Sequence, residues 1–188
     1  MIIESLKVEN FRHLANQSYH FDSQFNLIVG KNGSGKTSLL EALYFLSHTR
    51  SFRTSRVNQI IANGEDFFRL FAELSRPQIE DEELGGELSV SPFRSQLGIE
   101  RDRQEIRVRQ DYETVTRRSH LAKLLPILFL GPDTGQLLVE SPKFRRQFID
   151  WGLFQNQEEY HRLWLRYERA LSQRNAALKQ HYPDGVLE

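Results

Sequence analysis

The sequence contains no cysteine, which excludes a disulfide framework and a thiolate zinc site. It also has no long apolar run. The longest one, Leu124–Leu130, is broken by Pro126, whereas a membrane-spanning helix needs about twenty apolar residues. The N-terminus, Met1-Ile2-Ile3-Glu4, lacks the basic residues and the apolar stretch of a secretion signal. These absences predict a soluble cytoplasmic protein with no membrane partner.

The chain has no excess of charge of either sign, because 25 basic side chains balance 25 acidic ones. Zero net charge removes the simple electrostatic case for nucleic-acid binding. The basic residues are nevertheless uneven, with 19 arginines against 6 lysines. The planar guanidinium suits phosphate and carboxylate, but on composition alone a lineage bias toward arginine is the favoured explanation of the ratio.

Hydrophobic patterning predicts an α/β fold of one domain, or of one domain with the beginning of a second. Strands are expected at 2–9, 17–21, 25–29, 67–74, 87–92, 95–100, 104–110 and 127–130, and helices at 36–47, 114–125, 142–155 and 158–180. The segment Phe25–Val29 is almost wholly apolar, as a strand covered on both faces should be. We expect it at the centre of a mixed sheet, beside Ile127–Leu130. The helix at 36–47 is expected to bury Leu39, Leu40, Leu43 and Leu46.

A glycine-rich loop follows that apolar segment and satisfies the phosphate-loop pattern G-x-x-x-x-G-K-[ST] at every position. Its residues are Gly30, Lys31, Asn32, Gly33, Ser34, Gly35, Lys36 and Thr37. In this pattern the glycines let backbone N–H groups turn toward phosphates, the lysine reaches the β- and γ-phosphates, and the hydroxyl of the last residue ligates Mg²⁺. The loop therefore predicts binding of ATP with Mg²⁺, with Thr37 as the metal ligand.

The rest of the chain narrows the class of phosphate-loop protein. A GTPase is disfavoured because neither D-x-x-G nor N-K-x-D occurs. Two strand-like segments precede the loop strand, whereas small-molecule kinases usually open on that strand. An antiparallel flap before the loop resembles the ATPases of the ABC and SMC kind.

Four spaced motifs then resemble one family in particular. They are N-F-R at 10–12, R-S-F-R at 50–53, S-P-K-F-R-R-Q-F-I-D-W-G at 141–152 and Q-R-N-A-A-L-K at 173–179. With the phosphate loop, this set is similar to the RecF family of bacterial DNA replication and repair proteins. The resemblance runs from Leu6 to Lys179 and is weakest between about 75 and 120.

The resemblance implies an ABC-type head, with residues 1–140 forming an ATP-binding lobe I and residues 141–188 beginning a helical lobe II. It further implies an ATP-dependent homodimer, a role in the DNA damage and SOS response, other recombination-mediator proteins of the RecFOR pathway as partners, and DNA with single-stranded and junction character as ligand. The family's signature loop and Walker B acidic pair do not occur, and Gly131-Pro132-Asp133 replaces that pair. We therefore expect about half of a family member, with an incomplete sheet, which binds ATP but hydrolyses it poorly or not at all.

Several arginines are candidates for anion binding. Arg12 either contacts nucleotide phosphate, as the resemblance implies, or is a surface residue. Arg50, Arg53 and Arg56 can meet DNA phosphates, a dimer partner or nearby carboxylates. Arg145 and Arg146 can serve DNA or pair with Asp150, and the structural role is favoured.

Two other functions remain open at this point. One is a phosphate-loop enzyme that phosphorylates or hydrolyses a small molecule. The other is a non-catalytic dimerisation head that uses ATP only to hold two subunits together. Turnover without DNA would distinguish the first of these from an ATP-dependent DNA-binding protein.

Overall fold

The computed structural model describes residues 1–76, 93–131, 142–157 and 159–181. The chain divides into two compact units, Met1–Phe129 and Leu130–Glu188. The predicted strand at 87–92 and the predicted lobe boundary after residue 140 lie outside the described residues. Each unit is described by itself below.

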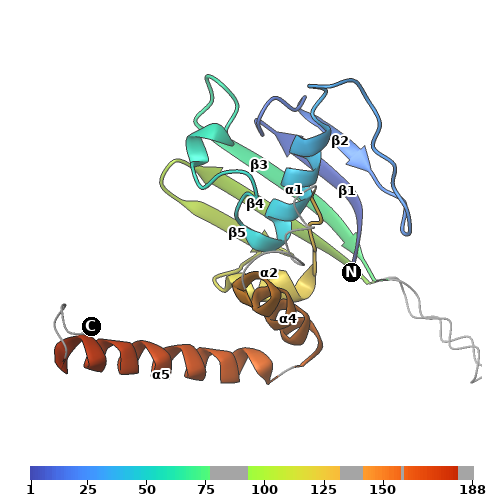
Figure 1. Cartoon of the computed structure of the whole chain (residues 1–188). Helices are drawn as coiled ribbons and strands as arrows, with labels where there is room; N and C mark the ends of the chain where they lie inside the picture. The colour runs from blue at the N-terminus through green and yellow to red at the C-terminus, as the bar shows by residue number, and fades with distance from the viewer. Residues whose placement is uncertain (77–92, 132–141, 158, 182–188) are drawn as a thin grey trace, which may run out of the picture. The chain divides into compact units, whose positions relative to one another are not determined.

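Unit 1 is built on one antiparallel sheet with strand order β2-β1-β3-β4-β5-β6 (Figure 1). The strands are β1 Ile2–Glu9, β2 Gln17–His20, β3 Phe67–Ser75, β4 Arg94–Asp102, β5 Ile106–Gln110 and β6 Glu113–Thr114. Five of them match predicted strands within a few residues. The pairing of β1 with β2 confirms the antiparallel flap before the phosphate loop.

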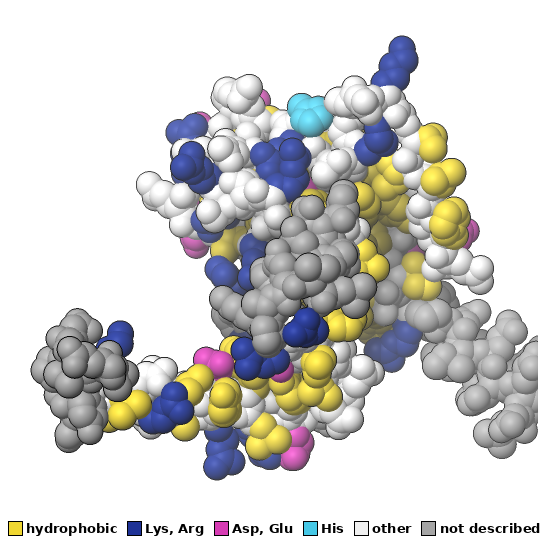
Figure 2. Space-filling view, viewed as in Figure 1, with side chains coloured by type: hydrophobic (Ala, Val, Ile, Leu, Met, Phe, Trp, Pro, Cys, Tyr) yellow, Lys and Arg dark blue, Asp and Glu magenta, His cyan; other side chains and the backbone are white. Residues whose placement is uncertain are grey.

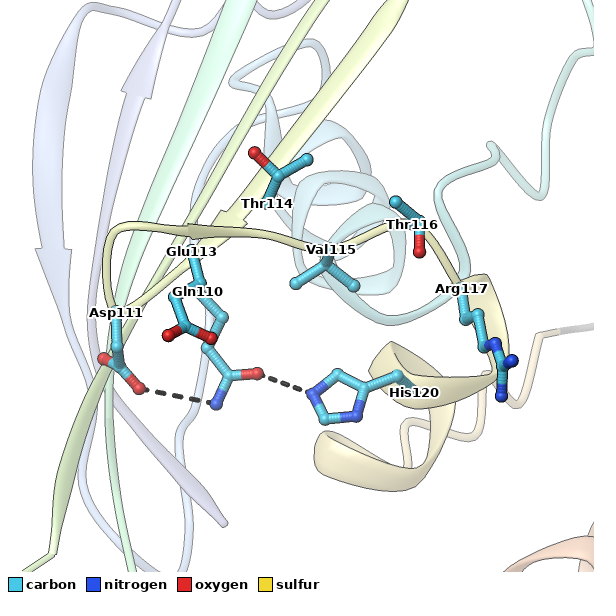
Figure 3. Close-up of a pocket in the computed structure, with 8 residues that line it drawn as sticks. All are labelled: Gln110, Asp111, Glu113, Thr114, Val115, Thr116, Arg117 and His120. Atoms are coloured by element: carbon cyan, nitrogen blue, oxygen red, sulfur yellow. Dashed lines mark hydrogen bonds between the residues drawn. The ribbon is translucent and has the colours of Figure 1, made fainter.

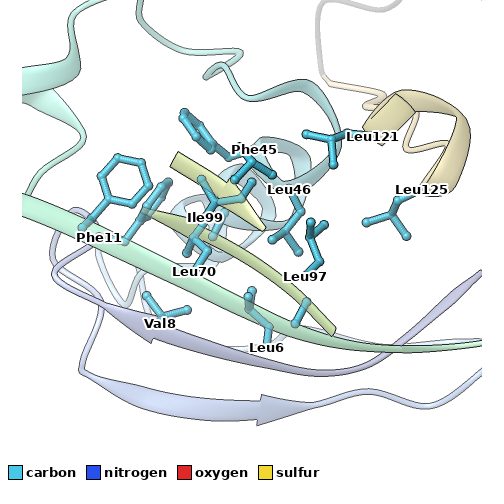
Figure 4. Close-up of a cluster of buried hydrophobic side chains, with 14 of the residues drawn as sticks. Leu6, Val8, Phe11, Phe45, Leu46, Leu70, Leu97, Ile99, Leu121 and Leu125 are labelled. Carbon is cyan, nitrogen blue, oxygen red and sulfur yellow. The ribbon is translucent and has the colours of Figure 1, made fainter. Parts of the chain in front are cut away.

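The two faces of the sheet differ because side chains alternate along each strand. On β3, Phe68, Leu70, Ala72 and Leu74 are buried, whereas Arg69 and Glu73 point to the exposed face. Helix α1, Lys36–His48, covers the buried face. Figure 4 shows the resulting core, in which Leu6, Val8 and Leu97 of the sheet meet Phe45 and Leu46 of α1.

Three aromatic rings fix α1 to the sheet. Phe11 comes from the loop after β1, Phe45 from α1 and Phe68 from β3, and all three are buried. Their rings meet edge to face, with centroids 5.0 Å apart for Phe11 and Phe68 and 5.1 Å apart for Phe45 and Phe68. This geometry suits the ring quadrupoles, so the helix that follows the phosphate loop has a defined position on the sheet.

The helix at 36–47 is confirmed, but of its four predicted core leucines only Leu39 and Leu46 are buried, and Leu43 is partly buried. Leu40 is 42% exposed, because the buried stripe contains Ser38 and Glu41 beside Leu39, Ala42, Phe45 and Leu46. A glutamate is not expected in a core stripe.

The remaining helices are shorter or more exposed than their patterns suggest. A 3-10 turn, η1, spans Val57–Gln59, and α2 spans Arg118–Leu124 only, since β6 takes the start of the predicted helix. In unit 2, α4 spans Pro142–Asn156 and α5 spans Tyr160–His181, as predicted. On α5, the large apolar side chains Trp164, Tyr167 and Leu178 are exposed.

The predicted central strand is wrong for this chain. Phe25–Val29 forms no strand, and Phe25, Leu27 and Val29 are about three-quarters exposed. Ile127–Leu130 also forms no strand, and Leu128 and Leu130 are exposed. A buried central strand needs neighbours on both sides, and the six described strands pair only antiparallel with one another. In Figure 1 the segment between β2 and α1 runs along the upper right margin of the molecule, and Figure 2 shows exposed hydrophobic side chains along this margin.

Candidate nucleotide-binding site

The phosphate loop leads directly into the N-terminus of α1. Residues 31–34 are exposed, and the Ser34 N–H donates to the Lys31 carbonyl at 3.2 Å, which closes a tight turn. Gly35 is the N-cap with φ of 95°, and no side chain caps the helix. The first-turn N–H groups of α1 thus have no side-chain acceptor, which is the arrangement that favours a phosphate.

Lys36 lies back over this turn. Its Nζ donates to the carbonyl oxygens of Gly30 at 2.7 Å and Lys31 at 2.8 Å. Two carbonyls thus hold the ammonium group over the loop, beside the free N–H groups of the helix. Thr37 is exposed on the first turn of α1, where its hydroxyl is accessible to a cation. The donor set fits the triphosphate with Mg²⁺ that the sequence predicts.

Gly35 also fixes the loop after β1. A Cβ at this position would lie 2.7 Å from Leu14 Cδ2 and 3.7 Å from His13 Nε2. The positive φ favours glycine, and a side chain here would have to displace the end of the Leu14 side chain. The segment that carries Arg12 is therefore packed directly against the phosphate loop.

Arg12 points to the middle of α1. Its Nη2 donates to Glu41 Oε1 at 2.5 Å and its Nε to Glu41 Oε2 at 3.0 Å, while Nη1 donates to the Gln59 carbonyl. A guanidinium carries five N–H groups, so two remain for a further acceptor. The predicted contact with nucleotide phosphate stays a prediction, as does the alternative of a surface residue, and the Arg12 side chain is 14% exposed and ion-paired with Glu41.

The segment Arg50–Arg56, called the arginine segment below, follows α1. Arg50, Arg53 and Arg56 are all exposed. Ser51 Oγ accepts from the N–H groups of Arg53 at 2.8 Å and Thr54 at 3.1 Å, which makes the segment a compact turn. Of the three contacts that the sequence left open, Arg53 shows the one with a nearby carboxylate, since its Nη1 lies 3.3 Å from Glu41 Oε2. The structure describes Arg145 and Arg146 in α4, where Asp150 accepts a hydrogen bond from the Tyr160 hydroxyl at 2.5 Å.

Glu41 is the residue that sequence reasoning missed. It is fully buried and lies between Arg12 and the arginine segment. A hydrophobicity pattern treats any glutamate as a surface residue. The position of Glu41 could have predicted its burial, because it lies on the same helical stripe as Ser38, Ala42 and Phe45.

A hollow lies beside β5, β6 and α2, away from the phosphate loop. It has a volume of about 410 Å³ and is lined by residues from β5 to α2 (Figure 3). Gln110 Oε1 accepts a hydrogen bond from His120 Nε2 at 2.7 Å, and Gln110 Nε2 donates to Asp111 Oδ2 at 3.5 Å. Asp111 accepts from the Gln96 N–H and the Ser95 hydroxyl, and these bonds lower its pKa. Gln110, Asp111 and His120 are thus held by one another and by β4, and no lining residue belongs to the phosphate loop.

The described residues show neither a metal cluster nor a membrane helix. No group of three or more His, Asp or Glu side chains in this part of the chain is placed to hold a metal ion. Among the described helices, none has the length and apolarity to cross a lipid bilayer.

Comparison with known families decides the class. Residues 1–123 match the family model described as AAA ATPase domain. The chain belongs to the AAA ATPase domain family. This match covers the phosphate loop, Arg12, Glu41 and the arginine segment, and it confirms the predicted phosphate-loop class.

Individual relatives support the more specific resemblance. The DNA replication and repair protein RecF of Haemophilus influenzae (strain ATCC 51907 / DSM 11121 / KW20 / Rd) is 40% identical over the whole of this chain, and the RecF of Shewanella denitrificans is 41% identical over 95% of it. The aligned regions make up 49% and 46% of those proteins, so the chain spans about half the length of the curated relatives it matches.

A solved structure has the same fold. It is described as the recombination mediator protein RecF-ATP in the RecFOR pathway, and it matches all of this chain and 47% of its own with a TM-score of 0.75 at 24% identity. The predicted ABC/SMC-like ATPase fold, with its antiparallel flap, is confirmed. The RecF similarity also confirms the family resemblance of the four sequence motifs.

Proposed function

We propose that this chain binds ATP with Mg²⁺ and forms the nucleotide-binding part of an ATP-dependent DNA-binding protein in replication and recombinational repair. The observation that carries the proposal is the phosphate loop, where two carbonyls hold Lys36 beside the uncapped N-terminus of α1. Family membership and the 40% identity to RecF support it.

The proposed binding mode assigns one task to each part of the loop. Backbone N–H groups of the loop other than that of Ser34 face the phosphates, Lys36 neutralises the β- and γ-phosphate charge, and Thr37 ligates Mg²⁺. The excess of negative charge at the phosphates meets the positive end of the α1 dipole. Arg12 offers its two remaining N–H groups to the same ligand.

Hydrolysis of ATP needs a carboxylate that orients water and holds the metal. Glu41, the buried carboxylate nearest to the loop in the sequence, already accepts four hydrogen bonds. We therefore infer nucleotide binding with little or no turnover by this chain alone. ATP-dependent dimerisation of two such heads belongs to the same proposal.

The DNA-binding part of the proposal rests on the arginine segment. Its three arginines are exposed and adjacent to α1, and guanidinium groups bind phosphate in two-pronged geometry. Such contacts position DNA without reading its sequence. The proposed ligand is DNA with single-stranded and junction character, with other recombination-mediator proteins as partners.

Titration calorimetry with ATP tests the binding site. Lys36→Met should abolish detectable binding, because it removes the charge on the β/γ-phosphates and leaves the loop backbone intact. Thr37→Ala should weaken binding in Mg²⁺ much more than in EDTA. Lys7→Met, on the exposed side of β1, is the matched control and should bind like the unaltered chain.

The result that defeats the assignment is unchanged affinity in a folded Lys36→Met protein. Steady turnover of a small phosphate acceptor without DNA would instead support an enzyme that acts on a small molecule.

A further inference from the structure

Glu41 is a buried carboxylate whose two oxygens are completely used. Oε1 accepts from Arg12 Nη2 and Ser51 Oγ, and Oε2 accepts from Arg12 Nε and Arg53 Nη1. The side chain has no exposed surface. A buried charge is stable only when such partners are present, so these contacts determine where Arg12 and Arg53 can lie.

The partners come from two separate segments. Arg12 belongs to the loop after β1, which packs on Gly35 of the phosphate loop through Leu14. Ser51 and Arg53 belong to the arginine segment, and Ser51 in turn accepts the N–H groups that close its turn. Glu41 itself lies on the helix that starts at the phosphate loop. One carboxylate thus joins three parts of the proposed site.

The charges in the cluster are not balanced. Two guanidinium groups face one carboxylate, which leaves one positive charge in excess. The Arg12 side chain is 14% exposed and that of Arg53 is 43% exposed. An anion bound near one arginine weakens the ion pair of that arginine with Glu41. The ion pair of Glu41 with the other arginine changes as a result.

We propose that Glu41 is a positioning residue that holds the Arg12 loop and the arginine segment on α1 together, so that a nucleotide at the phosphate loop alters the order of the arginine segment. The inference rests on the proposed function, since it takes ATP as the ligand of the loop. It assigns Glu41 no contact with the nucleotide. Its role is exerted through Arg12, Ser51 and Arg53.

Glu41→Gln is the main variant. It keeps the size of the side chain but replaces one acceptor oxygen by an NH₂ group that faces the N–H donors of arginine. Glu100→Gln is the matched control, because Glu100 also binds two arginines, Arg69 and Arg107, but on the exposed face of the sheet. The whole chain is used, and circular dichroism checks the folding of each variant.

Amide hydrogen exchange at Arg53 and Thr54, with and without Mg²⁺-ATP, is the readout. In the unaltered chain and in Glu100→Gln, ATP should change exchange at these amides. In Glu41→Gln, exchange without ATP should be faster, the effect of ATP should disappear, and ATP affinity should fall about tenfold, within the range of coupling between neighbouring sites. If Glu41 only stabilised the fold, Glu41→Gln would not remove the effect of ATP on the amides of Arg53 and Thr54.

The outcomes separate this inference from the proposed function. If the unaltered chain binds ATP but Glu41→Gln retains its affinity and its exchange response, the positioning role is wrong. If the unaltered chain does not bind ATP, the proposed function fails. The positioning role is then judged without nucleotide, and it is wrong if the amides of Arg53 and Thr54 exchange at the same rate in Glu41→Gln and Glu100→Gln. Should Glu41→Gln not fold, Glu41→Asp keeps the charge but is one methylene shorter, and the same comparisons apply to it.

Discussion

Phe68 and Phe71 lie on the same strand but on opposite faces of the sheet, which allows a controlled test of the core that positions α1. Phe68 is fully buried and meets Phe11 and Phe45 edge to face. Phe71 is 38% exposed, on the face that α1 does not cover. Truncation of each ring to alanine removes the same atoms from two different environments.

The magnitudes follow from burial. Phe68→Ala should cost about 3–5 kcal/mol, since it removes a fully buried ring and leaves a cavity that the neighbouring rings cannot fill. Phe71→Ala should cost less, about 1 kcal/mol, since the ring is partly exposed and its removal leaves no enclosed cavity. With a urea m-value of roughly 1–3 kcal/mol per molar, about 4 kcal/mol corresponds to a midpoint shift of more than about 1 M.

Urea denaturation followed by far-ultraviolet circular dichroism measures both variants. We expect a large midpoint shift for Phe68→Ala and a small one for Phe71→Ala. Because Phe68 holds α1 through Phe45, ATP affinity should also fall for the first variant only. Equal destabilisation by the two substitutions, or a larger effect of Phe71→Ala, would refute this account of the core.

Three further predictions concern the site and its surroundings. Gly35→Ala should lower ATP affinity and cost about 1–2 kcal/mol of stability through its positive φ. The control Gly64→Ala has the same backbone cost but no neighbour within 4 Å of the new Cβ, so it should leave ATP affinity unchanged. Equal ATP affinities of the two variants in calorimetry would argue against the packing of the Leu14 side chain on Gly35. Burial lowers the pKa of His48 below its ordinary value of 6.5, and Arg50 adds to this although the Tyr44 carbonyl opposes it. The unfolded imidazole therefore takes up protons first, so that stability is complete above about pH 6.5 and falls as the pH drops through the lower folded value; His48→Gln should flatten thermal-denaturation midpoints between about pH 5 and 7, and an unchanged profile would contradict the role of burial. Replacement of the three arginines of the arginine segment by glutamine should weaken binding of junction DNA equally for all sequences and reduce the salt slope by roughly 0.9 per lost phosphate contact; tight, salt-insensitive binding in fluorescence anisotropy would place the DNA surface elsewhere.

The parts of the fold that were predicted correctly are those that local patterns determine. The alternation along β3 and the apolar spacing of α1 identified both elements, and the phosphate-loop motif placed the N-terminus of α1 at Lys36. These signals depend on residues that are close in the sequence. The flap was predicted for the same reason, since β1 and β2 are joined by a short loop.

The errors concern residues whose environment depends on distant partners. Phe25–Val29 has the composition of a buried strand, but composition does not say whether neighbouring strands are present to cover it. Glu41 has the opposite problem, since its charged partners Arg12 and Arg53, 29 and 12 residues away, make its burial favourable. Neither partner can be identified from the helical pattern of α1.

The central claim is that ATP binds at the phosphate loop of unit 1. An NMR titration of the ¹⁵N-labelled chain with Mg²⁺-ATP tests it most directly, because backbone amides form the proposed phosphate contacts. The account predicts that the largest shifts fall on the amides of Gly33, Gly35 and Thr37, with none in Lys36→Met. Shifts that are largest around Gln110 and His120, or that persist in Lys36→Met, would contradict it.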